Sequence, residues 1–93
     1  MQARWHIFFS GQVQGVGFRY RSNYLARAYY LTGWVKNLYD GRVEMEVQGE
    51  LSQIRKFLVQ LKGQKYIRIE HMDIEELPLR PEERTFGVDD PYF

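Results

Sequence analysis

The sequence predicts one α+β domain in which an antiparallel sheet is covered on one face by two helices. Segments rich in aromatic and β-branched residues alternate with two helix-like segments, in the order strand, helix, strand, strand, helix, strand. The 93 residues are enough for one hydrophobic core and too few for two. A βαββαβ chain of this size buries its apolar faces most simply as a ferredoxin-like sandwich. We therefore interpret residues 1–93 as a single ferredoxin-like domain.

The first strand and helix are predicted on either side of a glycine-rich loop. Residues 4–10 are aromatic and β-branched, which is typical of a strand. Three glycines follow within residues 11–17. The next segment has few helix breakers and places Leu25 and Tyr29 at helical spacing, so we expect a helix from about Phe18 to Tyr30.

The next two strands, 33–37 and 42–48, are predicted to form a hairpin. A two-residue turn would pair Lys36 with Met45 and place the lysine on the apolar face. A three-residue turn that ends in a left-handed glycine pairs Val35 with Met45 instead. The second register leaves the charged residues of both strands pointing outward. It is preferred because it buries no charge.

The second half of the chain supplies the other helix and the remaining strands. Apolar residues recur at helical spacing within 51–63 and predict a core-facing stripe: Ile54, Phe57, Leu58 and Leu61. Residues 67–77 form a further strand, in which the alternation slips between Ile69 and Met72 and indicates a bulge. A short edge strand is expected near 85–88.

Composition excludes several classes of function. Thirteen basic and 12 acidic residues give a net charge of +1, which argues against a nucleic-acid binder that relies on a global basic field. The chain has no cysteine for a disulfide, a thiolate nucleophile or a cysteine-metal site. No stretch has the length of a membrane span, and the N-terminus lacks the pattern of a signal peptide. We expect a cytoplasmic protein with no membrane or nucleic-acid partner, and a monomer.

The loop at 11–17 is a candidate anion site. Gly15 and Gly17 bracket Val16, so successive backbone N–H groups can turn inward as a nest, next to a helix N-terminus. Arg19 follows in the first helical turn, where its guanidinium can grip two oxygens of a phosphate. The loop fits neither the Walker A nor the dinucleotide motif. An ordinary strand-to-helix turn is the alternative interpretation.

Two spaced motifs carry a resemblance to a known family. They read Gly11-x-Val13-Gln14-Gly15-Val16-Gly17-Phe18-Arg19 and Gly33-Trp34-Val35-Lys36-Asn37-x-x-x-Gly41-x-Val43-x-x-x-x-x-Gly49. In this order, on a chain of this length, they closely resemble both signatures of the acylphosphatases. The resemblance extends over nearly the whole chain. One departure is Tyr30, which stands where many members have glycine and would be strained if left-handed.

The resemblance implies a small enzyme that hydrolyses the carboxyl-phosphate bond of acyl phosphates to a carboxylate and inorganic phosphate, with no metal or cofactor. It implies that the catalytic residues are Arg19 and Asn37, where Arg19 grips the phosphate and Asn37 positions the attacking water. The implied phosphate-binding residues form one run: Gln14, Gly15, Val16, Gly17, Phe18 and Arg19. Gln14 is either a hydrogen-bonding residue within the loop or a direct ligand. Inorganic phosphate is expected to inhibit as well as to be the product.

Two other functions share this element order. An RNA-recognition module needs aromatic residues on its third strand, but the corresponding segment here is acidic and has none. A regulatory or carrier domain would bind a small anion without turnover. No spacing of histidines or carboxylates indicates a metal site.

Overall fold

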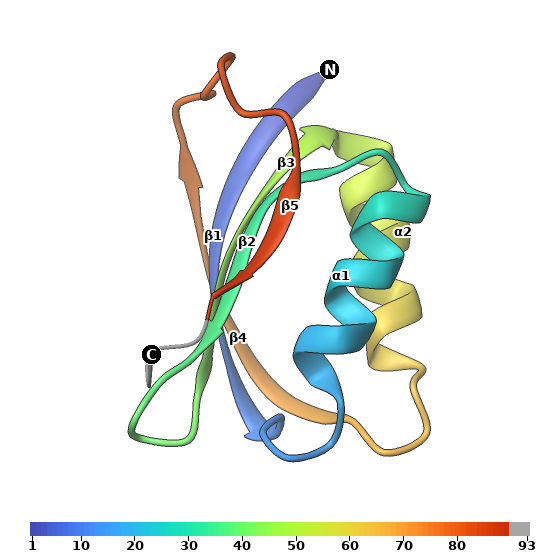
Figure 1. The fold of residues 1–93 in the computed structure, drawn as a ribbon, viewed down its shortest axis with the longest axis vertical. Coiled ribbons are helices and arrows are strands. Elements are labelled where there is room, and N and C mark those ends of the chain that lie inside the picture. The colour runs from blue at the N-terminus through green and yellow to red at the C-terminus, as the bar shows by residue number, and fades with distance from the viewer. Residues whose placement is uncertain (90–93) are drawn as a thin grey trace.

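The computed structural model describes residues 1–89 and contains two helices against one sheet (Figure 1). In chain order the elements are β1 (Gln2–Gln12), α1 (Phe18–Ala28), β2 (Thr32–Asn37), β3 (Val43–Glu50), α2 (Leu51–Lys62), β4 (Arg68–Leu77) and β5 (Phe86–Asp89). Both helices lie on the same face of the sheet, as predicted. The predicted stripe of α2 is buried, and α1 is two residues shorter at its end than expected.

The sheet is mixed rather than wholly antiparallel. Its order is β4-β1-β3-β2-β5, and the first four strands pair antiparallel as predicted. β5, the expected short edge strand, pairs parallel with β2. Because β4 and β5 are at opposite edges, the segment 78–85 crosses one end of the sheet between them. After this crossing, β5 runs parallel to β2. This pairing places the end of β5 beside the end of β2.

The predicted hairpin register and bulge are both confirmed. Val35 pairs with Met45, and the turn closes through a hydrogen bond from the N–H of Leu38 to the carbonyl of Arg42 at 2.8 Å. Gly41 has a φ of 96°, as the three-residue turn requires. On β4 the register shifts opposite Ser10 and Gly11, where the pairing skips one residue. The hairpin therefore keeps its charges away from the core.

A buried arginine organises the sheet face opposite the helices. Arg4 is 1% exposed, although it carries a full charge. It donates from Nε to Glu46 at 2.8 Å and from Nη1 to Glu83, in the 78–85 segment, also at 2.8 Å. Burial raises the pKa of Glu83, but the hydrogen bonds to its carboxylate, that from Arg4 first, and the nearby positive charges of Arg4 and Arg80 together outweigh burial and hold this pKa below its ordinary value. Glu46 thus points outward as expected, yet it is engaged in an ion pair.

The turn after α1 contains the strained tyrosine that the sequence suggested. The N–H of Leu31 donates to the carbonyl of Ala26 at 2.8 Å, and the N–H of Tyr30 donates to that of Arg27 at 3.2 Å. This pair of bonds is a Schellman motif, which normally places a glycine where Tyr30 stands. Tyr30 has a φ of 59°, in the left-handed region, and its side chain is 87% exposed. Its conformation is therefore set by the backbone turn and not by packing.

Candidate functional site

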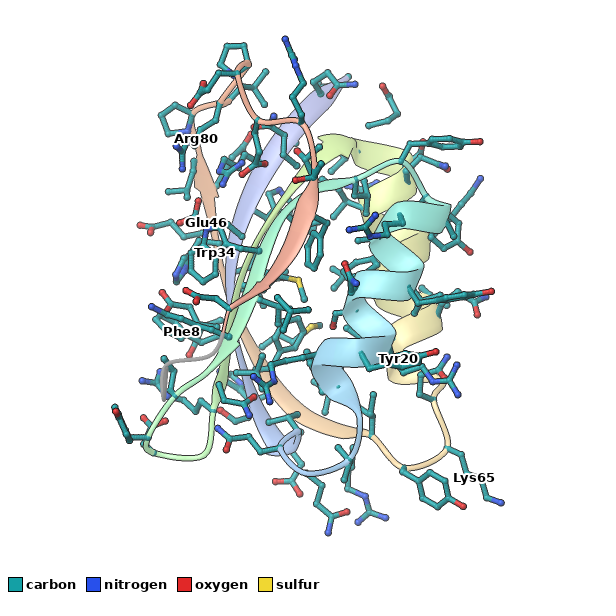
Figure 2. All side chains as sticks on the ribbon, viewed as in Figure 1. Phe8, Tyr20, Trp34, Glu46, Lys65 and Arg80 are labelled. Carbon is teal, nitrogen blue, oxygen red and sulfur yellow. The ribbon has the colours of Figure 1, made fainter. Side chains whose placement is uncertain are left out.

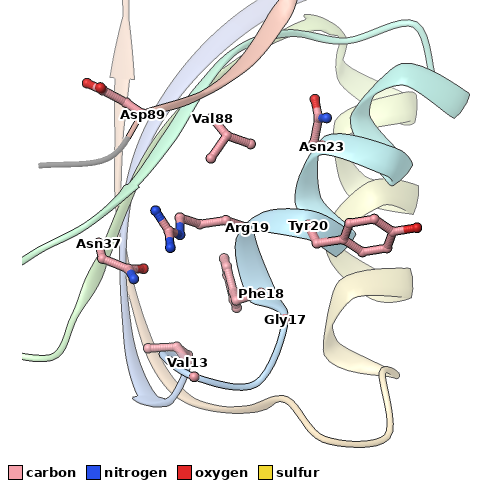
Figure 3. Close-up of a pocket in the computed structure, with 10 residues that line it drawn as sticks. Val13, Gly17, Phe18, Arg19, Tyr20, Asn23, Asn37, Val88 and Asp89 are labelled. Carbon is pink, nitrogen blue, oxygen red and sulfur yellow. The ribbon is translucent and has the colours of Figure 1, made fainter. Parts of the chain in front are cut away.

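A pocket of about 580 Å³ opens where the β1–α1 loop, the start of α1 and the ends of β2 and β5 meet (Figure 3). Side chains in Figure 2 fill the space between helices and sheet, so this pocket lies at the edge of the core. The residues that line it are Val13, Gly15, Gly17, Phe18, Arg19, Tyr20, Asn23, Asn37, Val88 and Asp89. Residues from both sequence motifs therefore line one pocket.

The β1–α1 loop presents backbone N–H groups. Gly15 and Gly17 have φ values of 74° and 81°, a conformation that glycine adopts without strain. Among the described residues, no side chain caps the start of α1. Within residues 1–89, no hydrogen bond engages the N–H groups of residues 15–19. Unpaired N–H groups at a helix N-terminus carry partial positive charge, so this end of the pocket favours an anion.

Arg19 gives the pocket its positive charge. Its side chain extends from the first turn of α1 towards β2, on the side where Asn37 lies (Figure 3). It makes no hydrogen bond or ion pair with the described part of the chain. The first turn of α1 contains no acidic residue to neutralise it. A guanidinium with five free N–H donors, next to unpaired backbone N–H groups, suits a phosphate group.

Asn37 brings a polar side chain to the same pocket from the end of β2. It pairs with Val43 in the hairpin, and its side chain is directed into the pocket (Figure 3). The amide oxygen Oδ1 is buried and accepts no hydrogen bond from residues 1–89. A buried polar atom without a partner costs about 1–3 kcal/mol, so such atoms call for an explanation. A bound water or ligand in the pocket would supply the missing donor.

The side chain of Gln14 is engaged within the protein. Its Nε2 donates to the carbonyl of Leu38 at 2.7 Å and to that of Arg42 at 2.8 Å. These bonds fasten the β1–α1 loop to the turn that follows Asn37. Gln14 therefore acts as a hydrogen-bonding residue of the loop, which was one of its two expected roles. Neither Gln14 nor Val16 lines the pocket.

The sequence did not single out the pocket residues between α1 and β5. Asn23 lies one helical turn after Arg19, and this i, i+4 spacing was a signal that could have identified it. Val88 and Asp89 belong to β5, and only its parallel pairing with β2 places them at the pocket. Their positions depend on the path of the 78–85 segment, which has no local signature.

Within residues 1–89, no group of three or more His, Asp or Glu side chains is arranged to hold a metal ion. No helix in the same range is both long and apolar enough to cross a membrane.

Comparison with known proteins gives consistent matches over nearly the full length. The family model for acylphosphatase matches residues 5–88. The acylphosphatase of Geobacillus thermodenitrificans is 44% identical over 86 residues, which are 91% of this chain and 92% of that protein. That of Clostridium acetobutylicum is 39% identical over 89 residues, with 95% and 98% covered. The crystal structure of acylphosphatase from Bacillus subtilis matches with a TM-score of 0.86 and 32% identity, covering 96% of this chain and 99% of that one.

Proposed function

This chain belongs to the acylphosphatase family, and from that premise we propose that its pocket binds the phosphoryl group of an acyl phosphate and hydrolyses the carboxyl-phosphate bond. The observation that carries the proposal is that two groups in this pocket, the Arg19 guanidinium and the Asn37 amide oxygen, have no hydrogen-bond partner among residues 1–89. As far as the described residues go, the pocket therefore has donors for phosphoryl oxygens and an acceptor for the hydrogen of a water molecule.

Binding comes first in this mechanism. The N–H groups of residues 15–19 and the guanidinium of Arg19 donate to the phosphoryl oxygens. These donors are in place before substrate arrives, because the loop is fastened by Gln14 and its two glycines hold the left-handed conformation. A preorganised set of donors stabilises the charge that develops on the phosphoryl oxygens in the transition state.

The attacking water is held by Asn37. Its Oδ1 accepts one hydrogen of the water and orients the water oxygen towards phosphorus. The new bond forms between this oxygen and phosphorus, while the bond from phosphorus to the acyl oxygen breaks and the carboxylate leaves with its electron pair. Because a carboxylate is a good leaving group, no strong base is needed. A phosphoryl oxygen takes the proton of the water.

Hydrolysis of a panel of acyl phosphates, with and without a metal chelator, tests this proposal. We expect turnover that survives chelation, competitive inhibition by inorganic phosphate and no hydrolysis of a phosphate monoester with a poor leaving group. A non-catalytic anion-binding domain would bind phosphate without turnover. Loss of all activity on thorough chelation would contradict the metal-free mechanism.

Arg19→Ala should abolish both turnover and phosphate binding while the fold persists. The loss of a charge-assisted hydrogen bond lowers affinity by about 1.5–3 kcal/mol, which is about 10- to 150-fold. Arg21→Ala is the matched control, because Arg21 is an exposed arginine on α1 that does not line the pocket. The readout is the rise in melting temperature on addition of phosphate. If phosphate protects the Arg19 variant as well as the wild type, Arg19 does not anchor the anion.

A further inference from the structure

The charged side chains of the two helices and of the turns that follow them are all basic. Residues 18–31 and 51–67 contain seven basic residues and no acidic residue. The other six basic residues and all 12 acidic residues lie elsewhere in the sequence. Because both helices lie on one face of the sheet (Figure 1), this segregation makes the helix side of the molecule positive. The net charge of +1 averages the two sides and conceals the difference between them.

These basic residues have no partner of opposite charge in the described part of the chain. Every ion pair among residues 1–89 is made by groups outside the two helix segments. Arg19 lines the pocket described above, and the other six are exposed: Arg21, Arg27, Arg55, Lys56, Lys62 and Lys65. We call these six residues, with the exposed tyrosines of the same segments, the basic helix face. A surface with no counter-charges of its own attracts polyanions.

The large exposed side chains of the basic helix face are aromatic. Four of them are tyrosines that are 61% to 87% exposed: Tyr20, Tyr24, Tyr30 and Tyr66. Val59 is the one large aliphatic side chain exposed in these two described segments. A membrane surface is contacted best by several large aliphatic or tryptophan side chains, which insert below the lipid headgroups. Exposed tyrosine rings instead offer flat surfaces on which nucleic-acid bases stack.

Two of these rings lie next to a cation. The Cζ atom of Arg21 is 5.8 Å from the centre of the Tyr20 ring, and Nζ of Lys65 is 5.4 Å from the centre of the Tyr66 ring. Tyr20 and Lys65 both point away from the sheet (Figure 2). A nucleotide joins a flat base to a charged phosphate, so a ring beside a cation is complementary to it. Single strands fit best, because the bases of a duplex are already stacked on one another.

The basic helix face includes part of a second pocket, at the end of α2. This pocket measures about 390 Å³, and its polar lining residues are Gln12, Lys62, Lys65, Tyr66 and Arg68. None of the described residues that line it is acidic. Lys62 lies in the last turn of α2, where a cation also offsets the helix dipole. Lys65 and Arg68 follow the helix, so the dipole does not account for them. Three cations around one cavity favour a bound phosphate.

We propose that the basic helix face binds single-stranded nucleic acid. Lys62, Lys65 and Arg68 bind backbone phosphates at the second pocket, and a base stacks on Tyr66. The proposal goes beyond the proposed function and does not depend on it, because the two pockets share no lining residue among those described. It replaces the expectation of no nucleic-acid partner, which rested on the net charge of the whole chain.

The first test measures how binding depends on salt. The full chain is titrated into a fluorescent oligothymidylate of about 12 nucleotides, a length within the range of single-stranded sites, and fluorescence anisotropy gives the affinity. Lys62→Gln/Lys65→Gln removes two charges from the second pocket. Lys36→Gln/Arg80→Gln is the matched control, because it removes the same net charge from residues outside the basic helix face. Melting temperatures confirm that both variants fold.

Three neutralised phosphates predict a slope of about −2 for the logarithm of affinity against the logarithm of salt concentration. This slope corresponds to an about 20-fold loss of affinity between about 50 and 200 mM salt. Lys62→Gln/Lys65→Gln should reduce the slope to about −0.7, whereas Lys36→Gln/Arg80→Gln should keep it near −2. Lys62→Gln/Lys65→Gln should also hydrolyse acyl phosphate as the wild type does, because neither lysine lines the substrate pocket.

The second test asks whether bases are bound. An abasic oligomer of the same length carries the same phosphates without bases. Tyr66→Leu should weaken binding of oligothymidylate about 5- to 150-fold, the effect of losing one stacked base, and should leave binding of the abasic oligomer unchanged. Tyr39→Leu is the matched control, because Tyr39 is 79% exposed and lies in the β2–β3 turn. This variant should bind both oligomers as the wild type does.

Three results would overturn the proposal. If the two double variants change the salt slope equally, only the net charge of the protein matters. If the abasic oligomer binds as tightly as oligothymidylate, the face binds polyanions without recognising bases. If the wild type does not bind oligothymidylate, the proposed partner is wrong. Phosphatidylserine vesicles and sedimentation at low salt then show whether a membrane surface or the acidic side of a second copy occupies this face.

Discussion

Replacing Asn37 by alanine should separate turnover from folding. Its Oδ1 is buried and accepts no hydrogen bond from residues 1–89, so in the free protein it imposes a desolvation penalty of about 1–3 kcal/mol. Asn37→Ala removes that penalty together with a small amount of packing at the end of β2. We therefore expect the free energy of unfolding to stay the same or to rise by up to about 2 kcal/mol. An asparagine that merely stabilised the turn would have the opposite effect.

Turnover of the same variant should fall steeply. Removal of one well-placed polar group from a site of this kind costs about 10²–10³ in kcat, equivalent to about 2.7–4 kcal/mol. The anion-binding part is untouched, because Arg19 and the loop N–H groups are supplied by α1 and the β1–α1 loop. The inhibition constant of inorganic phosphate should therefore stay close to that of the wild type. Turnover, phosphate inhibition and melting temperature are measured on one preparation.

Ser22→Ala provides the control for this experiment. The Oγ of Ser22 is also buried without a hydrogen-bond partner among the described residues, but Ser22 does not line the pocket. This variant should gain stability and keep its turnover. Near-wild-type turnover in folded Asn37→Ala would refute the water-positioning role. Joint loss of turnover and phosphate affinity would instead make Asn37 a phosphate ligand.

Three further variants test the supports of the site and fold. Gln14→Ala loses hydrogen bonds of 2.7 and 2.8 Å to the β2–β3 turn. It should therefore lower the free energy of unfolding by about 1–3 kcal/mol and lower kcat in the hydrolysis assay. If both quantities stay unchanged, the β1–α1 loop does not need these hydrogen bonds to keep its conformation. Tyr30→Gly replaces a tyrosine in the left-handed conformation, 87% exposed, by a residue that adopts this conformation without strain. It should raise the free energy of unfolding, measured in urea, by about 1 kcal/mol. A lower free energy of unfolding would contradict the strain at Tyr30. The lowered pKa of Glu83 means that its ionised form is favoured by folding, so its contribution is complete above its ordinary value of 4.5 and is lost as the pH falls through the folded pKa. Glu83→Gln should therefore lower the melting temperature at pH 7, by leaving Arg4 with one carboxylate partner fewer, and should flatten the fall of melting temperature below about pH 5. If the melting temperature of Glu83→Gln falls at low pH as steeply as that of the wild type, Glu83 is not the group whose protonation destabilises the protein there.

Local pattern in the sequence determined the elements and the faces they bury. The helical spacing of Ile54, Phe57, Leu58 and Leu61 predicted which side of α2 meets the core, and these residues are buried. The hairpin register followed from a single charge, because the alternative would have placed Lys36 on the apolar face. Such predictions succeed because alternation and helical periodicity are properties of neighbouring residues. The motif around Gly15 and Gly17 was local in the same sense.

Tertiary structure alone decided which distant residues share the pocket and which charge is buried. Asn37 and Arg19 line the same pocket because β2 and α1 converge at one end of the molecule. Val88 joins them because the 78–85 segment crosses the sheet and returns β5 parallel to β2. Arg4 alternates with apolar neighbours as any outward-facing strand residue does, and only Glu46 and Glu83 arriving from other segments allow its burial. These contacts join residues far apart in the chain, so they depend on strand order and on the path of the connecting segments, which local residue patterns do not encode.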